Sequence, residues 1–147
     1  MSFSSDINKF TAKTKADTNE VIAKTFMRIG TLIVERTPVG DITSWKGPAP
    51  KDYRPGSLVN SWFSRVGSPS TENMRSSNTS GAQSLANINR VAARAAGNVV
   101  VLYNVAPYAN RIEYAGHSGQ APTGFVRRTV EEFQQIIKVT VNGVKSN

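Results

Sequence analysis

The sequence predicts an α+β fold, in which a small, mostly antiparallel sheet packs against a long N-terminal helix and a C-terminal helix. Two observations support this. Apolar residues recur at helical spacing near both ends of the chain, and a β-branched run, Val99-Val100-Val101, lies between them. A chain of 147 residues can bury a core, so we expect one domain over residues 1–147 with inserted loops near 38–57 and 67–83.

The first helix is expected over about residues 6–36, with Ser4, Ser5 or Asp6 as its cap and Thr37-Pro38 as its end. Four apolar residues recur at i, i+4, i+7 and i+11, which places them on one face: Ile22, Phe26, Ile29 and Ile33. The first half of this helix is mostly polar. It either projects from the core, lies on a neighbouring molecule or is a frayed terminus.

A loop over residues 37–57 is rich in Pro and Gly and contains Trp45 and Tyr53. Aromatic side chains in so long a loop indicate packing against the same domain or against a partner subunit. Residues 57–66 are expected to form a strand, and residues 68–82 an exposed loop.

Residues 84–96 predict a short helix, with a strand as the alternative, and residues 99–103 predict a strand. Residues 108–114 fit a short helix or a strand. The last helix is expected over 123–138, and the tail from 139 fits a final strand near 139–142 or a disordered end. We expect a core of fourteen residues: Ile22, Phe26, Ile29, Ile33, Leu58, Trp62, Val100, Leu102, Tyr108, Ile112, Phe125, Val130, Phe133 and Ile137.

The composition excludes several classes of protein. The absence of Cys excludes disulfides, Cys-zinc sites and thiol catalysis, and no apolar run approaches the roughly 20 residues of a membrane span. The net charge of +8 favours polyanions, so a basic nucleic-acid-binding module remains an alternative. The basic residues are spread along the whole chain, however, whereas a nucleic-acid arm usually carries a dense block.

No group of residues predicts catalysis, and we expect no enzyme, no metal and no cofactor. The only candidates for a hydrolytic site are Asp41, Asp52 and His117, which share no known catalytic or calcium-binding spacing. Arg127 and Arg128 are expected in the first turn of the last helix, where cations oppose the helix dipole. Local stability would not explain them there, which favours an acidic partner or passing DNA; the alternative is that both are ordinary solvated surface residues.

Four short motifs follow one another along the chain. They read Thr37-Pro38-Val39, then Gly56-Ser57-Leu58-Val59-Asn60-Ser61-Trp62, then Pro107-Tyr108-Ala109-Asn110-Arg111-Ile112-Glu113-Tyr114-Ala115-Gly116, then Ala121-Pro122-Thr123-Gly124-Phe125-Val126-Arg127-Arg128-Thr129-Val130. In this order they resemble the tail-completion and neck proteins of tailed bacteriophages, also called head–tail joining or minor tail proteins. Two features depart from that pattern: residues 40–55 separate the first two motifs, and Ala115 interrupts Tyr-Gly.

The resemblance implies a structural virion subunit at the head–tail junction, assembled in the bacterial host cytoplasm. Such a subunit forms a homo-oligomeric ring, commonly of six copies, which ends the tail tube and docks it to the head connector. Its partners are the portal or connector proteins and the tail-tube protein, with genome DNA passing through the lumen and no membrane involved. We expect subunit contacts at Trp45, Tyr53, Arg54, Arg111, Glu113, Arg127 and Arg128.

Overall fold

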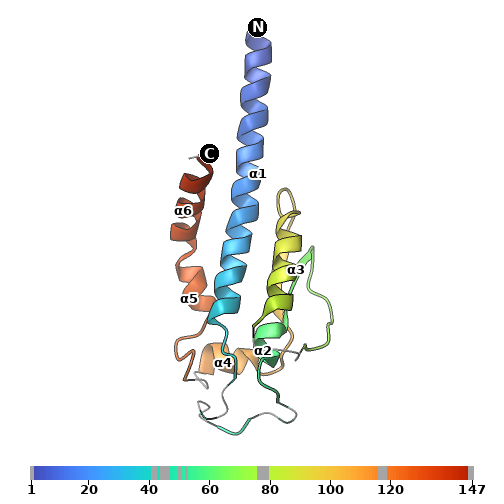
Figure 1. The fold of residues 1–147 in the computed structure, drawn as a ribbon, viewed down its shortest axis with the longest axis vertical. Helices are drawn as coiled ribbons and strands as arrows, with labels where there is room; N and C mark the ends of the chain where they lie inside the picture. Colours follow the sequence, from blue (N-terminus) through green and yellow to red (C-terminus); the bar gives the residue numbers. More distant parts are fainter. Residues whose placement is uncertain are drawn as a thin grey trace.

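The computed structural model describes residues 2–40, 43, 47–49, 51, 53–75, 80–115 and 119–145. Its elements are α1 (Phe3–Arg36), α2 (Ser57–Asn60), β1 (Trp62–Val66), α3 (Ala82–Ala92), β2 (Val100–Asn104), α4 (Ala109–Ala115), α5 (Val126–Glu131) and α6 (Phe133–Lys145). Figure 1 shows α1 as the long axis, with α3 on one side, α5 and α6 on the other, and α4 at the lower end. The predicted α+β class is confirmed.

The long N-terminal helix is confirmed and begins at Phe3, three residues earlier than expected. Ser2 caps it, because its hydroxyl accepts a hydrogen bond from the N–H of Ser5 at 3.2 Å. The cap was therefore wrongly predicted at Ser4, Ser5 or Asp6. The helix ends where Pro38 disfavours helical backbone at Thr37. Its 34 residues span about 51 Å, so α1 extends well beyond the rest of the molecule.

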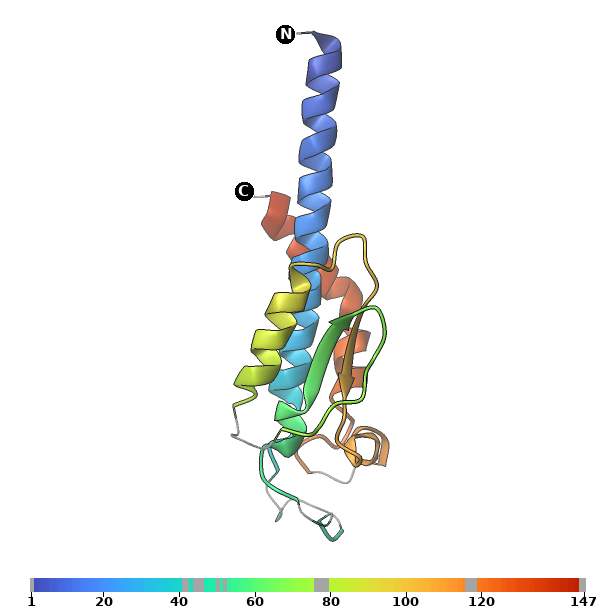
Figure 2. The same cartoon turned by 90° about the vertical axis from the view of Figure 1, so that its right-hand side faces the viewer.

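The sheet has two antiparallel strands, β1 and β2, and its register pairs Trp62 with Asn104 and Val66 with Val100. Figure 2 shows the strands side by side, with α3 to one side and α1 behind them. The strand predicted over 57–66 is half wrong, because residues 57–60 form the short helix α2. Leu58 and Val59 are consecutive and both buried, which a helical turn in the core allows but the alternating pattern of a half-covered strand does not.

The region of residues 108–114, which fitted a helix or a strand, is helical, since α4 covers Ala109–Ala115. The single last helix predicted over 123–138 is instead two helices. They are separated at Glu132, whose N–H bonds to the carbonyls of Thr129 and Val130. The strand or disordered tail expected from residue 139 is wrong, since α6 continues to Lys145. Ile136 and Val144, two turns apart on α6, are both buried, and this helical spacing overrides the strand preference of Val139 and Val141.

The core lies between α1, α2, α3, β1 and α4, together with the loop residues before α4 and α5. Six predicted core residues are buried in it: Ile33, Leu58, Trp62, Tyr108, Ile112 and Phe125. Phe26, Ile29 and Leu102 pack against it while partly buried, and Val100 and Ile137 are of intermediate exposure. Ile22, Val130 and Phe133 were wrongly placed in the core, because they lie on solvent-facing parts of α1, α5 and α6.

Two helical glycines allow a matched test of packing between α1 and α3. A Cβ at Gly30 would lie 2.8 Å from Cγ2 of Ile88, which is fully buried, whereas a Cβ at Gly143 would have no atom within 4 Å. We expect Gly30→Ala to destabilise the protein by about 1–3 kcal/mol despite the better helix propensity of Ala, because the fully buried Ile88 has to shift to admit the methyl group. Gly143→Ala should stabilise it by up to about 1 kcal/mol. Urea unfolding followed by circular dichroism measures both changes, and equal effects would contradict the packing described.

Candidate subunit interface

The first two sequence motifs lie together although residues 40–55 separate them in the chain. The N–H of Gly56 donates to the carbonyl of Val39 at 2.7 Å, so the two ends of the insertion are hydrogen-bonded to each other. The indole N–H of Trp62 donates to the hydroxyl of Thr37 at 2.9 Å, and this hydroxyl donates to the carbonyl of Ile33. The insertion thus leaves the packing between the motifs intact.

The third and fourth motifs are joined by the carboxylate of Glu113. Its Oε2 accepts the N–H groups of Phe125 and Val126 at 2.8 and 2.9 Å, and its Oε1 accepts the N–H of Arg127 at 2.9 Å. Glu113 therefore caps α5 from another helix and satisfies three N–H groups that have no partner inside α5. Gly124 permits this approach, since a Cβ there would lie 2.7 Å from Oε1 of Glu113 and the backbone φ is +87°.

The same carboxylate also binds a side chain. The Nε of Arg127 lies 3.1 Å from Oε1 of Glu113, and the guanidinium stacks on the ring of Tyr114. Burial favours a raised pKa for Glu113, but the hydrogen bonds from the three backbone N–H groups and from Arg127 outweigh it and hold the pKa below its ordinary value. Arg127 thus has a local partner, which corrects the expectation that local stability would not explain a cation at this position.

Of the other expected contact residues, the structure describes four: Tyr53, Arg54, Arg111 and Arg128. Tyr53 is half-buried and lies edge-on to Tyr108, with ring centroids 5.8 Å apart, so it packs on its own domain. Burial raises the pKa of Tyr108 to about 12. Arg54, Arg111 and Arg128 are exposed. Trp45 lies outside the described residues, as do the hydrolytic candidates Asp41, Asp52 and His117.

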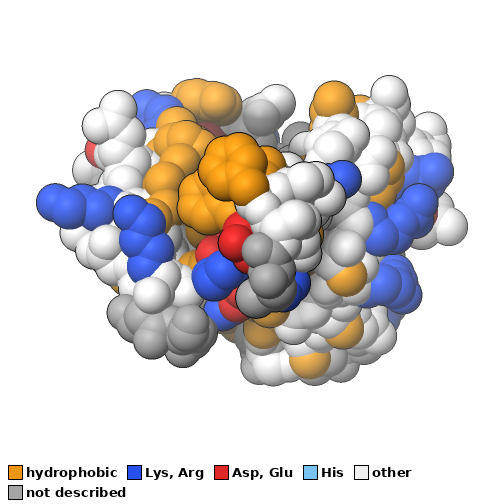
Figure 3. All heavy atoms as spheres, turned by 90° about the horizontal axis from the view of Figure 1, so that it is seen from above, with side chains coloured by type: hydrophobic (Ala, Val, Ile, Leu, Met, Phe, Trp, Pro, Cys, Tyr) orange, Lys and Arg blue, Asp and Glu red, His pale blue; other side chains and the backbone are white. Residues whose placement is uncertain are grey.

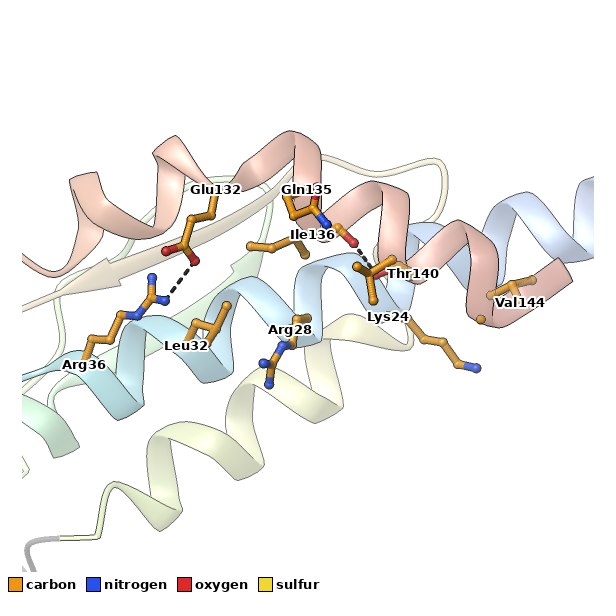
Figure 4. A pocket seen from close by; sticks show the side chains of 11 residues that line it. Lys24, Arg28, Leu32, Arg36, Glu132, Gln135, Ile136, Thr140 and Val144 are labelled. Atoms are coloured by element: carbon orange, nitrogen blue, oxygen red, sulfur yellow. Dashed lines mark hydrogen bonds and ion pairs between the residues drawn. The ribbon is translucent and has the colours of Figure 1, made fainter. Parts of the chain in front are cut away.

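A groove of about 490 Å³ lies along the junction of α1 and α6. Figure 4 shows Lys24, Arg28 and Arg36 along its α1 side, with Leu32 and Ile136 between the helices. Arg36 fixes one end of the groove, because its guanidinium bonds to the carboxylate of Glu132 at 2.8 Å and to the hydroxyl of Thr129 at 3.1 Å. This pair holds the junction of α5 and α6 against α1.

A second groove, of about 400 Å³, lies higher on the same two helices. It is lined by Thr14, Asp17, Thr18, Val21 and Ile22 of α1 and by Val141, Val144 and Lys145 of α6. Since Lys145 and Thr14 line the same groove, α6 ends beside Thr14. Above that level, no described helix or strand covers α1 (Figure 1).

We call residues 3–13, the uncovered part of α1, the arm. Three large apolar side chains are exposed on it: Phe3 by 81%, Ile7 by 47% and Phe10 by 69%. Their spacing of four and three residues puts them on one face, and the same spacing continues to Thr14 and Val21, which line the upper groove. Figure 3, seen from the arm's end, shows a group of hydrophobic side chains near the centre with acidic and basic side chains beside it. The apolar face of the arm therefore extends the seam that α6 covers lower down.

Sequence reasoning missed this feature. It treated the first half of α1 as polar, although Phe3, Ile7 and Phe10 already have the spacing of an apolar helix face. It also gave no sign that Glu113 and Arg127, 14 residues apart, would pair. Among the described residues, no cluster of His, Cys, Asp and Glu could hold a metal ion, and none of the described helices is both long and apolar enough to cross a bilayer.

Comparison of the chain with protein-family models, curated proteins and solved structures found no match. The relation to phage tail-completion and neck proteins therefore stays a prediction that depends on the order of the four motifs.

The cap formed by Glu113 gives a pH-dependent prediction. Because the folded-state pKa of Glu113 lies below its unfolded value, its contribution to stability is complete above about pH 4.5 and is lost as the pH falls through the folded-state value. We expect Glu113→Gln to lower the free energy of unfolding at pH 7 by about 3 kcal/mol. The reason is that the NH2 group of Gln would replace one carboxylate oxygen and would face backbone N–H donors instead of accepting from them. The difference from the wild type should shrink below pH 4.5.

Urea denaturation at a series of pH values measures this difference. Glu131→Gln is the matched control, because Glu131 lies on the exposed side of α5. Its effect should stay within about 0.5 kcal/mol at every pH. A constant deficit for Glu113→Gln down to pH 3 would contradict the proposed role of the carboxylate.

Proposed function

We propose that this chain is a structural subunit of a tailed-phage head–tail junction, which forms a ring with other copies of itself and joins the tail to the head. In this role it ends the tail tube, docks it to the connector and lets DNA pass through the ring. The chain then acts by its surfaces, without catalysis or a cofactor.

The arm is the observation that carries this proposal. The arm projects from its own domain and exposes three large apolar side chains to water. This exposure does not stabilise a free monomer, and such a patch is typical of a site that binds another protein. A subunit that is completed by its neighbours explains such an arm. The groove between α1 and α6 offers a further apolar surface on a different part of the molecule. Apolar surfaces on different parts of one chain allow it to contact more than one neighbour, as a subunit of an assembly does.

The packing of the four motifs also supports the proposal. Val39 and Gly56 close the insertion, Glu113 joins the last two motifs, and the rings of Trp62 and Phe125 meet edge-on at 6.0 Å between the second and fourth motifs. Motifs that pack against one another are expected to occur together in a family, because the side chains of each motif form the packing environment of the others.

The net charge of +8 favours the alternative of a nucleic-acid-binding module. Exposed basic residues lie on several elements, among them Arg90 on α3, Arg111 on α4 and Lys138 on α6. In a ring, such charge can line the DNA channel or face acidic neighbours. In a binding module, the monomer alone would bind short duplex DNA with an affinity that falls steeply as salt is added.

Negative-stain imaging of the particles made without this chain tests the proposal. We expect full heads beside unjoined tails, or tails of irregular length, and joined virions again when the chain is supplied. Normal joined virions in its absence would overturn the proposal. Titration of the purified chain with short duplex DNA at 50 and 200 mM salt distinguishes the structural subunit from the nucleic-acid-binding module. Tight and salt-dependent binding by monomers would favour the binding module.

A further inference from the structure

We propose that two copies of this chain pair through their arms, antiparallel, with Ile7 of each copy packed against Phe10 of the other. This inference goes beyond the ring and does not depend on it. A pair of this kind is symmetric and closes on itself, so it leaves the remaining surfaces free for head-to-tail contacts.

The apolar face of the arm has the spacing of a two-helix seam. Phe3, Ile7, Phe10 and Thr14 follow one another by four, three and four residues, as core positions of paired helices do. Phe3, Ile7 and Phe10 are exposed, and Thr14 leaves mainly its methyl group to contribute, because its hydroxyl already bonds to the carbonyl of Phe10 at 2.9 Å. In an antiparallel pair, Phe3 then faces Thr14 of the second copy while Ile7 faces Phe10.

The charges beside this seam select the antiparallel register. Asp6 comes directly before Ile7, and Lys13 comes directly before Thr14. Both charged residues therefore flank the seam on the same side. When Ile7 faces Phe10, Asp6 faces Lys13 of the second copy, and symmetry makes this pair twice. In a parallel pair, Asp6 would instead face Thr11 and Lys13 would face Thr18, without any opposite charge.

Lys13 is available for this contact. Its present partner is Asp17, one turn away at 2.8 Å, but the Lys13 side chain is 70% exposed and such exposed pairs contribute little stability. Lys15 falls on the outer side of the helix, where it remains in solvent. The seam is thus apolar, flanked by opposite charges and without a buried charge.

The end of α6 provides a second, independent argument. Glu132, directly before α6, pairs with Arg36, and Lys145, at the end of α6, lies beside Thr14, so α6 runs antiparallel to α1. An antiparallel arm from a second copy would begin next to Thr14 and continue along the line of α6 in the same direction. Its N-terminal end would face the C-terminal end of α6, an arrangement that the helix dipoles favour. The second arm therefore covers the part of the seam that α6 leaves open.

Sedimentation equilibrium of the purified chain tests the pairing. We expect a concentration-dependent dimer whose dissociation constant rises roughly tenfold or more in Phe10→Ser. The matched control is Val139→Ser, which removes a comparably exposed apolar side chain (60%, against 69% for Phe10) from the lower groove and should leave the dimer unchanged. Far-UV circular dichroism should show both variants folded. A monomer at all concentrations, or a dimer lost only in Val139→Ser, would overturn the proposal.

A charge exchange tests the register. Asp6→Lys or Lys13→Asp alone should weaken the dimer roughly three- to tenfold at low salt, and the two changes together should restore it. Lys15→Asp is the control on the outer side of the helix and should have little effect. If the double variant binds no better than the single variants, Asp6 does not face Lys13.

Disulfide trapping tests the direction, and the chain has no Cys of its own to interfere. A mixture of Ile7→Cys and Phe10→Cys chains should form the mixed disulfide faster than either chain forms a disulfide with itself. Faster self-pairing of Phe10→Cys would indicate parallel arms and overturn the antiparallel register. These measurements use the purified chain alone, so their failure is distinct from a failure of the head–tail proposal.

Discussion

The carboxylate of Glu113 is the interaction on which the lower half of the molecule depends. It begins α5 by accepting three backbone N–H groups, and it fixes the direction in which the chain leaves the loop before Phe125. That direction leads α5 to Arg36, which anchors Glu132 against α1 and sends α6 along the first helix. The groove between α1 and α6 therefore depends on a cap made outside it, at the start of α5.

The first helix serves two different purposes along its length. From Thr14 to Arg36 it is a scaffold: α3 packs closely at Gly30, and α6 covers another face. The arm, residues 3–13, is covered by no described helix or strand and exposes apolar side chains. A helix this long costs little extra to extend, because each added residue gains a backbone hydrogen bond once the helix has formed. The packed part of α1 can thus keep the arm helical and exposed before it contacts another molecule.

The sequence predicted those parts of the fold that depend on periodicity over many residues. The long helix, β2 and the burial of Trp62 and Phe125 were all predicted, because regular apolar spacing reports directly on a covered face. It could not predict contacts that depend on three-dimensional proximity. The division of the last helix at Glu132 and the link between Glu113 and the start of α5 belong to this group. Within the candidate interface, the apolar face of the arm could have been predicted from the spacing of Phe3, Ile7 and Phe10 in the sequence. The groove could not, because it depends on where α6 packs against α1.

The hydrogen bond between Val39 and Gly56 also bears on how this protein can change over evolutionary time. Because the two ends of the intervening segment are held together by the domain itself, the entropic cost of lengthening that segment grows only slowly with its length. Related genes can therefore gain or lose residues in this segment without breaking the hydrogen bond that closes it, as long as Tyr53 is kept, because its ring packs against Tyr108. Under the same condition, the segment is suited to inserting an affinity tag or a fluorescent label.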